Sequence, residues 1–171
     1  SVLVGGYTSS GGFLLNRYVE AGPEDSTFGA TTNLLNGNPT FTEGGAPVVL
    51  DADVQVFDAE LSAVDSFNGA TLTLVRDGGA DSDDEFSATG NLSTLTESGN
   101  LVLSSTTIGT VTTNSSGSLV LTFNGSATQA AVNETLQSIA YSNSSDNPPA
   151  SALLTWTFSD GNTGIQGTGG A

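Results

Sequence analysis

Apolar and polar residues alternate along several stretches of this chain. In the run SLVLTF, Leu119, Leu121 and Phe123 fall on one face of an extended segment, and the residues between them face the other way. A period of two is typical of a half-buried β-strand. On this basis we expect strands at 70–76, 118–123 and 152–158, and shorter ones at 39–43, 47–50, 101–104, 108–112 and 140–142.

Turn-forming pairs separate these runs. They are Asn36-Gly37, Asn68-Gly69, Asp77-Gly78, Ser116-Gly117, Asn124-Gly125 and Asp160-Gly161. Many short strands divided by regular turn signals predict an all-β fold, an antiparallel sandwich. The core-facing positions that the alternation predicts in the two other long strands are Leu72, Leu74, Ala152, Leu154, Trp156 and Phe158.

One segment departs from the alternation. In ATQAAVNETLQSIAY, Ala131, Leu136 and Ile139 recur near helical spacing, and Thr128 can cap the first turn. We therefore expect one short helix near 128–138, packed on one end of the sandwich.

The first part of the chain reads differently from the rest. Residues 2–7 and 13–19 form two short apolar runs joined by a polar turn, and an acidic segment that contains Pro23 follows. We divide the chain into an N-terminal strand extension at 1–22, a linker at 23–38 and a sandwich at 39–171.

The charge balance is strongly acidic. The 171 residues include 18 Asp and Glu, only 2 Lys and Arg (Arg17 and Arg76) and no His, so the net charge is −16. Nucleic acid and anionic membrane surfaces both need basic residues, so neither is an expected partner. No apolar run is long enough to span a membrane.

The residue types also limit catalysis. Because the chain has no Cys and no His, it has no disulfide, no thiolate zinc site and no Ser–His or Cys–His pair. A carboxylate pair of the glycosidase type is the remaining option, and 18 acids would give such a spacing by chance. We expect a protein that is not an enzyme.

The excess of carboxylates favours a hard cation such as Ca²⁺, which takes oxygen ligands. Two groups of acids are candidates for calcium sites, and a third run, DSDDE at 81–85, is instead expected to be a solvated, mobile loop. The first group is Glu43, Asp58, Glu60, Asp65 and Asp160, and a possible second is Asp51 with Asp53.

Five asparagines stand in N-x-Ser/Thr sequons. They act as glycosylation acceptors only in a host with the machinery, and in a chain rich in Asn, Ser and Thr they can also arise by chance. They are Asn91, Asn114, Asn124, Asn133 and Asn143.

Two stretches resemble a known family. GNPTFTEGGAPVVLDADVQVFDAELSAVD is similar to the opening half, and YSNSSDNPP with WTFSDGNTG to the closing half, of cadherin-like repeat domains in large bacterial surface proteins and adhesins. The resemblance covers about 36–171. It implies an extracellular Greek-key, Ig-like sandwich that binds calcium through Glu43, Asp58, Glu60 and Asp160, although the cadherin DRE and DxNDN motifs are not reproduced.

The N-terminal residues resemble something else. The similarity is to half of a β-repeat that occurs in tandem in bacterial secreted proteins, where repeats would stack as propeller blades; the matching stretch is VLVGGYTSSGGFLLNRYVEAGPEDSTFG. Half a blade cannot bury its own apolar face. In the cadherin-like family an alternating strand normally follows GTGG and closes the sandwich. The chain therefore reads as having one surplus strand and lacking another, or as cut at both ends from a longer polypeptide.

These features predict a function. We expect an extracellular structural subunit that assembles with copies of itself into a fibre or surface polymer by strand addition, stabilised by Ca²⁺. A calcium-stiffened spacer of a giant adhesin, next to other repeats or cell-surface ligands, is the alternative; a carbohydrate-binding module is more distant, since aromatic residues are few. The expected donor residues are Phe13, Leu14, Leu15, Tyr18 and Val19.

Overall fold

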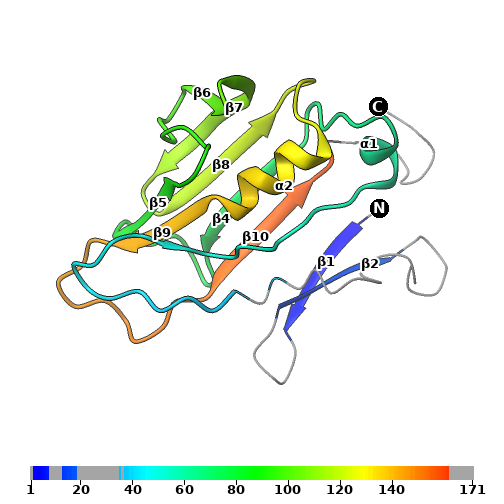
Figure 1. The fold of residues 1–171 in the computed structure, drawn as a ribbon. Helices are drawn as coiled ribbons and strands as arrows, with labels where there is room; N and C mark the ends of the chain where they lie inside the picture. The colour runs from blue at the N-terminus through cyan, green and yellow to red at the C-terminus, as the bar shows by residue number, and fades with distance from the viewer. Residues whose placement is uncertain (1, 8–12, 19–34, 36, 162–171) are drawn as a thin grey trace.

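The computed structural model describes residues 2–7, 13–18, 35 and 37–161 (Figure 1). The described chain is mostly β, with antiparallel pairing throughout. One sheet has five strands in the order β10 (Leu154–Ser159), β4 (Thr71–Arg76), β8 (Ser118–Phe123), β7 (Thr106–Ser115) and β6 (Asn100–Leu103). A second has three strands in the order β3 (Val48–Val49), β9 (Ile139–Asn143) and β5 (Asp84–Ala88).

The alternating runs form the core strands as predicted. Leu119, Leu121 and Phe123 of β8 are buried, as are Leu72 and Leu74 of β4. They pack in one cluster with residues of the three-stranded sheet such as Ile139, Phe86 and Tyr141, which places the core between the two sheets. The expectation of an all-β fold with two antiparallel sheets is therefore confirmed.

The last described strand is less buried than its neighbours. Leu154, Trp156 and Phe158 of β10 pack against the core but remain half-exposed. Phe158 meets Phe67 edge to face, with ring centroids 6.1 Å apart. Ala152 is exposed and precedes the strand, so its predicted core position is wrong.

The predicted helix is present as α2 (Gln129–Gln137). Thr128 is its N-cap, and its hydroxyl oxygen accepts a hydrogen bond from the Ala131 amide at 3.2 Å. Ile139 lies beyond the helix, fully buried at the start of β9.

Three local predictions are wrong. Residues 39–43 form no strand, because the chain turns there: the Gly45 amide donates to the Thr42 carbonyl at 2.7 Å. The run 81–85 is not a solvated loop throughout, since its last two residues begin β5 and Asp84 is buried. A second short helix, α1 (Ala59–Ala63), had no signal that we interpreted as helical.

The two N-terminal strands are also present. β1 (Val2–Tyr7) and β2 (Phe13–Tyr18) pair antiparallel, with Val2 opposite Tyr18 and Tyr7 opposite Phe13. They form a two-stranded sheet of their own, here called the β1–β2 hairpin, which shares no ladder with the strands described above. Val19 and the linker up to residue 34 lie outside the described residues.

Candidate functional site

The two sheets part along one side of the sandwich. There the outer strands β10 and β3 flank a cavity of about 360 Å³, here called the β10 groove. Tyr141 and Asn143 of β9 form part of its lining, so the groove reaches toward the buried sheet. The other lining residues are Leu35, 37–41, Val48, Leu50, Asp51, 148–154 and Trp156.

The groove presents apolar side chains that the fold does not fully cover. Trp156, Leu154 and Phe41 are half-exposed, and Leu153 is 52% exposed. Phe41 packs edge to face on Tyr141, with ring centroids 6.0 Å apart and planes at 78°. The groove is thus a partly apolar surface open to a partner.

The edge strand beside the groove carries outward-facing backbone groups in a fixed pattern. The Asp77 amide donates to the Leu153 carbonyl at 2.8 Å, so odd-numbered residues of β10 turn their N–H and C=O toward β4. Because these groups alternate along an antiparallel strand, those of Leu154, Trp156 and Phe158 face outward. No strand in the described part of the chain pairs with that side.

The other edges of the two sandwich sheets are short or covered. β3 has only 2 residues. Along β6, Leu92 bridges Leu103 and the Ser93 amide donates to the Val102 carbonyl at 2.9 Å. The Phe86 carbonyl of β5 accepts a hydrogen bond from the Asn114 side chain at 3.1 Å. β10 has 6 residues with no proline and no charge, and it therefore lacks the usual protection of an edge strand.

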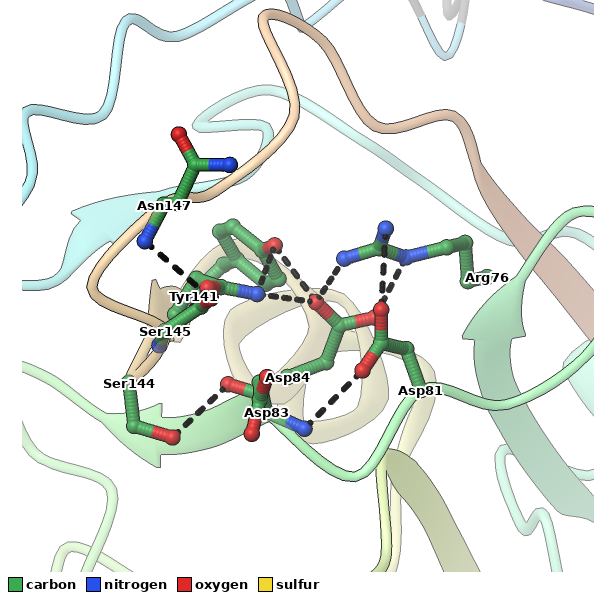
Figure 2. Close-up of polar contacts among 9 residues, drawn as sticks. Arg76, Asp81, Asp83, Asp84, Tyr141, Ser144, Ser145 and Asn147 are labelled. Carbon is green, nitrogen blue, oxygen red and sulfur yellow. Dashed lines mark hydrogen bonds and ion pairs between the residues drawn. The ribbon is translucent and has the colours of Figure 1, made fainter.

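A polar cluster adjoins the groove through Tyr141 and Asn143, which line it. Figure 2 shows the polar contacts of this cluster. Asp84 of β5 accepts hydrogen bonds on Oδ1 from the Tyr141 hydroxyl at 2.6 Å and from the side-chain amide of Asn143 at 2.9 Å. Arg76 of β4 donates from Nε to Asp84 Oδ2 at 2.8 Å and from Nη2 to Oδ1, and Nη1 lies 3.2 Å from Asp81 Oδ2. The cluster links the two sheets and fixes Tyr141 and Asn143, which line the groove.

The cluster keeps its charges. Burial alone would raise the pKa of Asp84, but hydrogen bonds from Arg76, Tyr141 and Asn143 hold that pKa below its ordinary value. The hydrogen bond to Asp84 raises the pKa of Arg76, and burial raises the pKa of Tyr141. Asp84 and Arg76 therefore stay ionised near neutral pH, and the arrangement suits a structural ion pair better than proton transfer.

Two of the predicted calcium ligands accept hydrogen bonds from amides at helix N-termini. Asp58 is the N-cap of α1, and its Oδ1 accepts from the amides of Glu60 at 3.0 Å and Leu61 at 2.9 Å. Asp65 Oδ1 accepts from the Gln129 amide at 2.9 Å, at the first residue of α2. Carboxylates are favoured there because they satisfy unpaired amides and face the positive end of the helix dipole.

The remaining three acids of that group lie in different surroundings. Glu43 is exposed at the turn after residue 42, Glu60 is half-buried in α1, and Asp160 follows β10 directly. Among the residues that the structure describes, no group of three or more acidic side chains is arranged to hold a metal ion.

Asp51 and Asp53 do come together. The buried Asp51 accepts from the Gly37 amide at 2.9 Å on one oxygen and from the Asp53 amide at 3.1 Å on the other. A hydrogen bond with the Asp51 carboxyl, and the negative charge of that carboxyl, raise the pKa of the exposed Asp53. The two carboxyls are therefore neighbours, and Asp51 lines the groove.

The sequon asparagines all make side-chain hydrogen bonds. Asn143 is buried on Asp84, and the Asn114 amide donates to the carbonyls of Phe86 and Leu95. Asn133 accepts from the Val56 amide at 2.8 Å, and Asn124 donates to the Thr107 carbonyl at 3.2 Å. Asn91, which donates to Glu134, is exposed.

Of the predicted donor residues, Phe13, Leu14, Leu15 and Tyr18 lie in β2. Comparison with protein-family models, with curated proteins and with solved structures found no match for this chain. None of the helices in the described ranges has the length and apolar character needed to cross a membrane.

Proposed function

We propose that this chain is a non-enzymatic, extracellular structural subunit that joins copies of itself by β-strand addition at the β10 edge. One observation carries the proposal: β10 is a long, uncharged edge strand beside an apolar groove, whereas the other three edges of the two sandwich sheets are short or covered. A strand that pairs there would satisfy the outward groups of Leu154, Trp156 and Phe158.

The cadherin-like, Greek-key assignment is part of the same proposal and rests on the sequence resemblance. Modules of that kind act as structural units outside the cell. The buried ion pair of Arg76 and Asp84 supports a structural role, because it links the two sheets beside the groove. The absence of His and Cys from the sequence is consistent with a protein that performs no nucleophilic chemistry.

A calcium-stiffened spacer is the second candidate. The proximity of the Asp51 and Asp53 carboxyls favours it, because a cation between them would relieve their repulsion. Calcium would also offset part of the net charge of −16. The two candidates differ in whether the protein self-associates.

The test of strand addition is a matched pair of variants at the edge. Leu154→Ala removes the side chain and keeps the outward amide, whereas Leu154→Pro removes the same side chain and the amide donor. Proline is tolerated at the first residue of an edge strand, so both variants should fold. We expect wild type and Leu154→Ala to form species larger than a monomer by light scattering after gel filtration, and Leu154→Pro to remain monomeric.

Two results would contradict strand addition at the β10 edge. A wild-type protein that stays monomeric at every concentration would refute strand addition and favour the spacer. Equal assembly of Leu154→Pro and Leu154→Ala would place the contact elsewhere on the molecule.

A further inference from the structure

The edge strand β10 has nearly the same residue pattern in both chain directions. Residues 154–158 read LTWTF: Trp156 is at the centre, a threonine stands on each side of it, and an apolar residue stands at each end. A two-fold contact between copies uses the same patch on both, so that patch must be complementary to itself. A strand whose pattern survives reversal meets this requirement when a second copy runs antiparallel beside it.

The backbone groups of β10 fit the same two-fold axis. Leu154, Trp156 and Phe158 face outward, and Trp156 lies midway between the other two. With the axis at Trp156, Leu154 of one copy lies opposite Phe158 of the other, and the two Trp156 residues lie opposite each other. The residues of each opposed pair then exchange both of their N–H···O bonds. No other two-fold register pairs all three outward residues within the strand.

The contact also avoids opposing carboxylates. Each copy has a net charge of −16, and like charges directly opposite each other destabilise a strand pair. β10 contains no charged residue, and the acid nearest to it in sequence, Asp160, falls opposite Ala152 in this register. The edge strand β5, by contrast, carries Asp84 and Glu85. At β10, two such acidic chains can meet without acids facing each other.

The side chains favour the pairing on both faces of the sheet. Leu154, Trp156 and Phe158 pack against the core but are half-exposed, so the same residues of a second copy would cover more of their apolar surface. On the other face, Thr155 of one copy lies opposite Thr157 of the second. Cross-strand threonine pairs stabilise sheets.

We infer that two copies join through β10 in an antiparallel, two-fold pairing centred on Trp156, which merges their five-stranded sheets into one. This inference rests on the proposed function and names the partner segment at the β10 edge. Because the contact uses the same patch on both copies, it closes at a dimer. A longer fibre would need a second, different contact.

Single cysteines test the register, because the chain has no Cys of its own. In the inferred pairing Thr155 and Thr157 form a non-hydrogen-bonded pair, with Cα atoms about 4.5 Å apart. Two copies of the same threonine are instead diagonal neighbours, about 7–8 Å apart. A disulfide needs Cα atoms within about 7 Å. With oxidised glutathione as the oxidant, a mixture of Thr155→Cys and Thr157→Cys should form a cross-linked dimer, which either variant alone should lack.

Salt provides a second test on the unmodified chain. Between about 0.01 M and about 0.15 M salt the Debye length shortens from about 30 Å to about 8 Å, which screens the repulsion between two chains of net charge −16. The dissociation constant of the dimer, measured by light scattering, should therefore fall as salt rises. A dissociation constant that rises with salt would overturn the inference, because it would indicate a contact between opposite charges.

The outcomes separate this inference from the proposed function. A cross-link in Thr155→Cys alone or in Thr157→Cys alone would overturn the register centred on Trp156. If Leu154→Pro abolishes assembly but the mixture of cysteine variants forms no cross-link, strand addition stands and β10 of a second copy is not the partner. If wild type never assembles, the proposed function itself is wrong.

Discussion

Replacing Asp84 by Asn tests the ion pair that links the two sheets. The Asp84 side chain is fully buried and that of Arg76 is only 16% exposed. The change keeps the shape of the side chain but removes its charge, so the Arg76 guanidinium loses its buried counter-ion. Tyr141 and Asn143 both donate to Asp84 Oδ1, and in the variant they face a neutral amide in place of the carboxylate.

The expected cost follows from this burial. Breaking a buried ion pair by removing one partner costs about 3–5 kcal/mol. Arg76 retains some access to water and lies 3.2 Å from Asp81, so we expect the lower end, about 3 kcal/mol. Against a total of about 5–15 kcal/mol for a domain, this is a large part of the stability.

Urea unfolding measures the effect. With a slope of about 2 kcal/mol per molar, the midpoint should fall by about 1.5 M at unchanged slope. Asp81→Asn is the matched control, because Asp81 contacts the same guanidinium but is 39% exposed, and it should cost at most about 1 kcal/mol. Equal losses in the two variants would refute the claim that Asp84 carries the cluster.

Three further predictions follow from the site. The folded-state pKa of Asp84 lies below its ordinary value of 3.8, so its ionised carboxylate stabilises the fold above that value, and this stabilisation is lost as pH falls through the folded pKa. In wild type the free energy of unfolding should therefore drop below about pH 4. Asp84→Asn should lack that part of the drop. Asp65→Ala should lower the free energy of unfolding by about 1 kcal/mol in the same urea assay, because the Gln129 amide at the start of α2 loses its acceptor. Asp77→Ala, on an exposed turn, is the control and should change the free energy of unfolding by no more than about 0.5 kcal/mol. If calcium binds the folded chain, the melting temperature should rise between chelator and millimolar Ca²⁺ and the rise should shrink in Asp53→Asn; an unchanged melting temperature in wild type would exclude a stabilising site.

Sequence reasoning succeeded where burial alone decides the structure. In β8 and β4 the inward residues are apolar and the turns are marked by glycine, so alternation placed both strands. It failed at β5, whose first inward residue is Asp84. Burial of Asp84 is favourable only because Arg76 compensates its charge. The two residues lie on strands of different sheets, so the local pattern around β5 does not reveal the pair.

For the candidate sites, the sequence did not show which hydrogen bonds the acids make. The calcium prediction for Asp58 and Asp65 depended on residue type, and the structure adds that each carboxylate accepts a hydrogen bond from an amide at a helix start. The partner of Asp65 is 64 residues away in sequence, so no local pattern could reveal it. The exposure of the β10 edge depends on strand order, which the sequence does not state. Alternation did identify Trp156 and Leu154, but as core residues.

Amide hydrogen exchange along β10 tests strand addition most directly. In dilute protein the outward amides of Leu154, Trp156 and Phe158 should exchange fast, and those of Thr155 and Thr157, which face β4, should exchange slowly. On assembly the three outward amides should become protected, while Thr155 and Thr157 stay unchanged. Outward amides that exchange equally fast at concentrations where the molar mass has risen would contradict the account.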